Sequence, residues 1–226
     1  MNGEVGFACR LTAAAKNAIK GAGFSFTAMQ YEKNTAFLFE KRGEEVGYRA
    51  ESPEAWYEKL SELGVCNVFL MMPFSGVDRR LLGMVNSNGC TIFAQFNDGT
   101  TSRFMPRWAF NQEEKTWDIT IYEELMQNAP ASAPSFKNNA NDFKKALGEI
   151  MKLADTLGFD QFAYGFARGY EILNGGAMPD NLDEMIVPKL DEDKLRMYLA
   201  ADISDVFGAM GLDVTVNAKS GNESLD

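Results

Sequence analysis

Clusters of acidic side chains are the clearest candidates for chemistry in this chain of 226 residues, and they lie toward its C-terminal end. Paired carboxylates can hold a divalent cation, share a proton in catalysis or attract a basic partner. The residues considered as a partner-binding surface are Asp183, Glu184, Asp191, Glu192 and Asp193. They lack the alternating oxygen ligands, central glycine and distal glutamate of a calcium loop, so we expect no bound metal and no cofactor.

The segment around these clusters carries an excess of negative charge. Residues 180–213 contain nine acidic and three basic side chains, a local net charge of -6. A negative helical surface can bind a basic protein and, in the limit, imitate the phosphates of a nucleic acid. Net charge also keeps proteins dispersed in water, and carboxylates at residues 191–193 suit a helix start. The resulting hypothesis is a non-catalytic protein-binding module with a basic protein as partner.

Histidine is absent from the sequence, and this absence excludes several catalytic sites. Histidine is the only side chain whose unperturbed pKa lies near neutrality, and it is the commonest metal ligand. Serine–histidine and cysteine–histidine nucleophiles are therefore excluded, as are zinc sites that need histidine. The chain also lacks a GKS/T phosphate loop, a helix-opening GxGxxG and a GxSxG elbow, which favours a protein without catalytic activity.

A second hypothesis stays open, because sites can be assembled from scattered residues. It is a histidine-free enzyme or a small-ligand-binding protein with a cleft between the two halves of the chain. Tyr164, Arg168 and Tyr170, in one aromatic helical segment, are the residues expected at this cleft. The same segment contains Gly165-x-x-x-Gly169, a spacing that allows close approach of a helix or a ligand.

Arg103, Arg107 and Trp108 combine positive charge with an aromatic ring, as nucleic-acid-binding surfaces do. Strand alternation places Trp108 on the face opposite to the arginines, so rings and charges do not share a surface. Asp118 is expected opposite Arg107, where it would neutralise the guanidinium. Because the net charge of -10 also repels phosphates, we expect no direct nucleic-acid binding.

The cysteines and the apolar runs bear on localisation. Cys9, Cys66 and Cys90 are widely spaced and form no CxxC pair, which predicts buried free thiols in a reducing cytoplasm. The N-terminal segment lacks the features of a signal peptide. The longest apolar stretch, residues 68–74, is far shorter than the ~20 residues that span a bilayer. We therefore expect a soluble, cytoplasmic protein without membrane association.

Composition divides the chain into two parts. Small, polar and proline residues predict a linker at 128–139, between an α+β region at 1–127 and a mainly helical region at 140–218, with a flexible tail at 219–226. Residues 1–136 hold 16 acidic and 13 basic side chains, and residues 137–226 hold 16 and 9. Most of the negative charge thus follows the linker. Whether the halves form one domain or two, and the oligomeric state, stay open.

Local patterns predict the elements of the first part. A helix is expected at 11–21, then strands at 24–31, 35–41 and 45–50. Ser52 and Pro53 then fit the start of a helix, and Gly64 fits its end. The continuous apolar run at 65–72 predicts a strand buried on both faces. The elements expected after it are a short helix at 77–85 and strands at 90–96, 101–110 and 115–123.

Turn patterns predict two strand registers. A two-residue Asp98-Gly99 turn would pair Phe93 with Phe104. A four-residue loop at 111–114 would pair Trp108 with Trp117.

Helical spacing of apolar residues predicts two helices in the second part, at about 143–157 and 160–173, and a third that Asp191 caps. A final strand is expected at 212–216. The predicted fold class is α+β, with antiparallel β-meanders covered by helices in the N-terminal half and a mainly helical C-terminal half.

Overall fold

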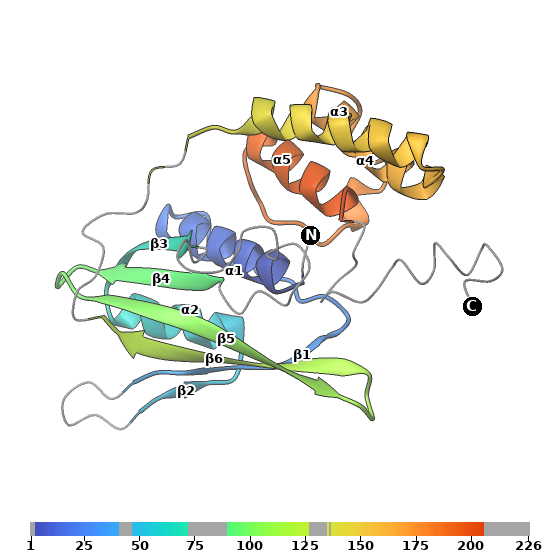
Figure 1. Cartoon of the computed structure of the whole chain (residues 1–226). Helices are drawn as coiled ribbons and strands as arrows, with labels where there is room; N and C mark the ends of the chain where they lie inside the picture. Colours follow the sequence, from blue (N-terminus) through green and yellow to red (C-terminus); the bar gives the residue numbers. More distant parts are fainter. Residues whose placement is uncertain (1–2, 41–46, 72–89, 127–134, 136, 206–226) are drawn as a thin grey trace.

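The computed structural model describes residues 3–40, 47–71, 90–126, 135 and 137–205. In this part of the chain, a six-stranded sheet with two helices precedes a group of three α-helices (Figure 1). The fold is α+β, as the sequence predicts, with a helical C-terminal half. Four predicted features lie wholly or mostly outside the described residues: the helix at 77–85, the linker at 128–139, the strand at 212–216 and the tail at 219–226.

The sheet has the strand order β2-β1-β6-β5-β4-β3. Strands β3 to β6 form an antiparallel meander, while β1 runs parallel to β6 and antiparallel to β2. The bounds are β1 Glu32–Leu38, β2 Arg49–Ala50, β3 Val65–Met71, β4 Thr91–Phe96, β5 Thr101–Asn111 and β6 Thr116–Leu125.

Helices α1 (Gly3–Ile19) and α2 (Pro53–Glu62) cover the same face of the sheet. Phe7 of α1 meets Trp108 edge-on at 5.6 Å between ring centroids, and Trp56 of α2 meets Phe104 edge-on at the same distance. Phe104 and Trp108 are four residues apart in β5, so their side chains project from one face. This aromatic layer forms the main core.

Local signals predicted α2 correctly. The Ser52 hydroxyl accepts a hydrogen bond from the Ala55 N–H at 3.2 Å, Pro53 begins the helix, and Gly64 follows it with φ +76°. The predicted start of α1 and the strand at 24–31 were wrong: α1 begins at Gly3, and residues 23–29 have no regular secondary structure. The aromatic residues that suggested this strand instead pack onto the helices, with Phe24 stacked on Tyr57 at 4.8 Å.

The turn between β4 and β5 shifts their register by one residue from the prediction. The loop has three residues, because the Phe96 N–H donates to the Thr100 carbonyl at 3.0 Å and Gly99 takes φ +84°. Phe93 therefore faces Arg103, and not Phe104. A shift of one residue reverses the face, so Phe93 lies on the opposite side of the sheet, where it stacks on Phe69.

The turn between β5 and β6 has the predicted four residues but lies one position later. Asn111 pairs with Thr116, since the Asn111 side-chain oxygen accepts the N–H groups of Glu113 and Glu114. The register therefore differs from the prediction by two residues, so that Trp108 pairs with Ile119. Because the shift is an even number, each side chain stays on its predicted face of the sheet. In place of the predicted contact with Asp118, Arg107 lies over the Tyr122 ring at 4.8 Å.

Strand β3 is buried on both faces only at its centre. Val68 and Phe69 project to opposite sides and are 0% and 3% exposed. In the described residues β3 forms one edge of the sheet, however, and its Cys66 is exposed.

Within residues 137–205, the C-terminal half contains α3 (Ala140–Thr156), α4 (Asp160–Leu173), the one-turn 3-10 helix η1 (Leu182–Glu184) and α5 (Glu192–Ile203). The Gly165-x-x-x-Gly169 spacing serves close helix packing, because both glycines of α4 approach the C-terminal end of α5. No helix within the described ranges is both long and apolar enough to cross a membrane.

We expect Gly169→Ala to lower the free energy of unfolding by about 1–3 kcal/mol. A Cβ atom at this position would overlap the Ser204 hydroxyl and lie 3.0 Å from the Ala200 carbonyl oxygen, so α4 and α5 would have to separate. Gly148→Ala is the matched control in α3, because its Cβ would lie 3.6 Å from the Tyr170 ring, an ordinary contact. Urea unfolding should show the control unchanged or stabilised by up to ~1 kcal/mol; equal losses would contradict the packing argument.

Candidate functional site

A pocket of about 430 Å³ lies between the two halves of the chain. The N-terminal half contributes Arg10 and Ala14 of α1 and residues 25–27 after this helix. The C-terminal half contributes residues 182–189, which run from η1 toward α5. Its volume is within the usual range for sites that hold a small molecule or part of a peptide.

Two irregular segments contribute to this pocket, one from each half of the chain. In the described part of the chain, no hydrogen bond is formed by the backbone N–H and C=O groups of residues 25–27 and 186–187, or by the carbonyl of Pro188, which has no N–H. Backbone polar groups need a partner from protein or water. An extended segment entering the pocket could supply one.

Arg10 lies at the buried side of the pocket and connects the two halves. Its side chain is 4% exposed and forms an ion pair with Glu32 of β1, whose side chain is 0% exposed. The same Glu32 carboxylate accepts the Met29 N–H at 2.8 Å. Arg10 also forms a side-chain hydrogen bond with Tyr198 of α5, while its buried Nε atom has no hydrogen-bond partner among the described residues. Residues of both halves therefore hold the guanidinium in place.

Burial and neighbouring charges shift the pKa of Arg10 in opposite directions. Desolvation alone would lower the pKa of Arg10, but the Glu32 carboxylate and Tyr198 outweigh it and raise this pKa. Burial raises the pKa of Tyr198 to about 12, against the opposing effect of Arg10. Tyr198 is therefore a neutral hydroxyl at physiological pH, and the ion pair of Arg10 with Glu32 has no net charge.

The exposed charged side chains of the pocket lining are mainly acidic. Asp183 and Glu184 line the pocket and are exposed, whereas Lys189 is the exposed basic residue of the lining. Since Glu32 balances Arg10, the pocket has a net charge of -1 from these side chains. Asp183 and Glu184 thus join the pocket, which the sequence did not indicate.

The remaining acidic residues of the predicted surface lie at the start of α5. Asp191 caps this helix by accepting the Lys194 N–H at 3.2 Å, and its side-chain hydrogen bond with Lys194 lowers the pKa of the carboxyl. Glu192 pairs with Arg196 at 2.9 Å, and Asp193 is exposed. The sequence correctly indicated a helix start here.

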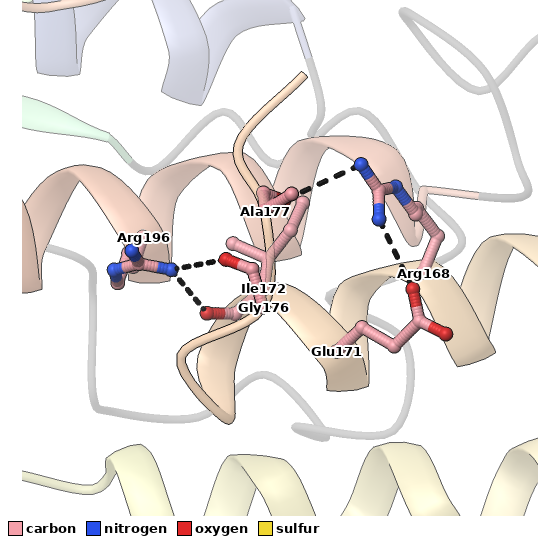
Figure 2. A network of polar contacts seen from close by, with 6 residues as sticks. All are labelled: Arg168, Glu171, Ile172, Gly176, Ala177 and Arg196. Carbon is pink, nitrogen blue, oxygen red and sulfur yellow. Dashed lines mark hydrogen bonds and ion pairs between the residues drawn. The ribbon is translucent and has the colours of Figure 1, made fainter. Parts of the chain in front are cut away.

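Tyr164, Arg168 and Tyr170 do not line this pocket. Arg168 contacts Glu171 at 3.0 Å and donates to the Ala177 carbonyl, beyond the C-terminal end of α4, at 3.3 Å (Figure 2). Tyr164 is 73% exposed, and Tyr170 packs against α3. Their role in ligand binding stays a prediction.

Figure 2 also shows that Arg196 of α5 holds the same helix end. Its guanidinium donates to the Ile172 carbonyl at 3.0 Å and to the Gly176 carbonyl at 2.8 Å. Carbonyl groups at a helix C-terminus lack partners within the helix, and a cation there is favourable. These contacts fix the segment that leads from α4 toward the pocket.

Arg10 is the residue that sequence reasoning missed. It follows Phe7 by three positions and precedes Ala14 by four, so it lies on an apolar stripe of α1. A charge on such a stripe is a signal for a buried partner, because an unpaired charge is costly to bury. Its partner Glu32 is 22 residues away, and no local pattern connects them.

The cysteines are free thiols. Cys90 is buried, Cys9 is partly buried and Cys66 is exposed, against the expectation that all are buried. Burial raises the pKa of Cys9 to about 11 and that of Cys90 to about 12, so both stay protonated at neutral pH. Among the described residues, no three cysteine or carboxylate side chains gather closely enough to hold a metal ion.

No protein-family model, curated protein or solved structure matches this chain.

Proposed function

We propose that this protein is a non-catalytic protein-binding module that holds an extended, basic segment of a partner protein in the pocket between its halves. The observation that carries the proposal is the pair of pocket segments, residues 25–27 and 186–188, whose backbone groups have no partner in the described structure. An extended peptide can hydrogen-bond to such groups, as in strand addition.

The side chains support a peptide of mixed character. Phe26, Ile186, Val187 and Pro188 line the pocket and offer apolar contacts for alternate side chains of an extended segment. Asp183 and Glu184 of the lining favour lysine or arginine over acidic residues.

Fluorescence anisotropy with labelled peptides tests this proposal. The probe is an acetylated Lys-Val-Lys-Val-Lys-Val hexapeptide, and the reference is the same peptide with glutamate in place of lysine. We expect the basic peptide to bind and the acidic one not to bind. The double variant Asp183→Asn/Glu184→Gln should weaken binding about tenfold, since two exposed ion pairs of up to ~1 kcal/mol each are lost.

Glu192→Gln/Asp193→Asn is the matched control, because it removes the same two charges outside the pocket lining. Equal weakening by both double variants would show attraction by overall acidity and contradict a pocket site. Thr27→Pro adds a backbone test: it removes one N–H of the pocket segment and should weaken binding, whereas Thr27→Val should not. Absence of binding by the basic peptide would reject the proposal.

A further inference from the structure

Helix α3 carries an apolar stripe that nothing in the described structure covers. The stripe consists of Ile150, Leu153 and Leu157, which are 43%, 56% and 58% exposed. On the neighbouring side of α3, Leu147 and Ala154 are buried against Phe166 of α4. The stripe is thus additional to the packing of the helical half. Figure 1 shows α3 on the side of this half that lies away from the sheet.

We infer that this stripe is the contact surface of a homodimer, in which α3 pairs antiparallel with α3 of a second copy. The inference is independent of the pocket, which α3 does not line. A two-fold axis near residues 151–152 would place Ile150 of each copy against Leu153 of the other. Exposed apolar stripes of this kind mark association surfaces.

The charged residues beside the stripe can form ion pairs with the same residues of a second copy. Glu149 and Lys152 each precede a stripe residue by one position, so they lie on the same flank of α3. In the antiparallel pairing, this flank faces the same flank of the second copy. Glu149 of each copy then meets Lys152 of the other, which forms two equivalent ion pairs. Lys152 has no ion pair in the described structure, and Glu149 has only a surface contact with Lys145 at 3.8 Å.

The local charge balance also favours a second copy. Residues 140–173 contain five acidic and four basic side chains, a net charge of -1 in a chain of net charge -10. Association at this surface therefore avoids most of the repulsion that other faces of the protein would cause. A strongly basic partner would find little net charge to recognise here.

Sedimentation velocity of the full chain over a wide range of concentration tests the dimer. We expect the wild type to reach twice the mass of one chain and Leu153→Asp to keep the mass of one chain. Tyr164→Asp is the matched control, since it introduces the same charge at an exposed ring on α4, two residues from the inward-facing Phe166. It should leave the dimer intact, and circular dichroism should show equal helix content in all variants.

Charge reversal separates self-association from binding of another protein. Glu149→Lys alone should weaken the dimer about tenfold, because two attractive contacts become repulsive. Glu149→Lys/Lys152→Glu should restore it, since each reversed residue again faces an opposite charge on the second copy. A wild type with the mass of one chain at every concentration would overturn the proposal, as would a dimer that survives Leu153→Asp. Failure of the double reversal to restore association would overturn the antiparallel arrangement.

Discussion

Arg10→Met is expected to lower the free energy of unfolding by about 3–5 kcal/mol. The substitution keeps most of the apolar stem but leaves the Glu32 carboxylate, whose side chain is 0% exposed, without its cation. Only the Met29 N–H, at 2.8 Å, would remain among the hydrogen bonds seen for this carboxylate. A buried charge without a partner is costly, and this cost, more than the loss of attraction, produces the effect. Urea unfolding monitored by tryptophan fluorescence gives the measurement.

A second substitution separates this explanation from a simple packing defect. Arg10→Met/Glu32→Gln replaces the stranded charge with a neutral amide whose oxygen can still accept the Met29 N–H, so most of the lost stability should return. Arg103→Met is the matched control. Its Arg103–Glu124 pair is 36% and 41% exposed, and breaking it should cost less than ~1 kcal/mol. A double variant as unstable as Arg10→Met would show that the charge of Glu32 is not the cause.

The elements that could be predicted from the sequence are those whose signals lie within a few residues. Helix α2 is the best case, because Ser52, Pro53 and Gly64 mark its ends without help from the rest of the fold. Asp191 likewise marks the start of α5 through its own side chain. In both cases the stabilising interaction joins residues a few positions apart, so a short stretch of sequence is enough to predict it.

The strand registers depend on turn geometry that composition does not determine. Asp98 and Gly99 suit both a two-residue and a three-residue turn, and the hydrogen bond from the Phe96 N–H to the Thr100 carbonyl selects the longer one. This choice moved Phe93 to the other face of the sheet. In the next turn, the side chain of Asn111 shifted the loop without changing which side chains share a face.

The pocket could not be predicted because its parts are far apart in the sequence. Arg10 and residues 182–189 lie more than 170 positions apart, and the Asn17 side chain donates to the Lys189 carbonyl across the same boundary at 2.9 Å. No periodicity or turn pattern reports such a contact. The residues of α4 that were expected at a cleft between the halves do not line this pocket.

The other large effect expected is a dependence of stability on pH that comes from Glu4. This residue is 4% exposed in the first turn of α1, and burial raises the pKa of its carboxyl from 4.5 to about 7. Between these pH values the unfolded chain has lost a proton that the folded chain keeps. The free energy of unfolding should therefore fall as pH rises from about 4.5 to about 7, by roughly 3 kcal/mol, and then level off.

Glu4→Gln should remove this fall, because the amide is neutral at every pH, and the variant should be more stable than the wild type at pH 8 by roughly 3 kcal/mol. The absence of histidine makes the measurement clean, since no imidazole titrates in this range. Glu54→Gln is the matched control: Glu54 occupies the first turn of α2 but is exposed, so its removal should leave the slope unchanged. A wild type whose stability is flat between pH 5 and pH 7 would mean that Glu4 ionises as readily in the folded chain as in water.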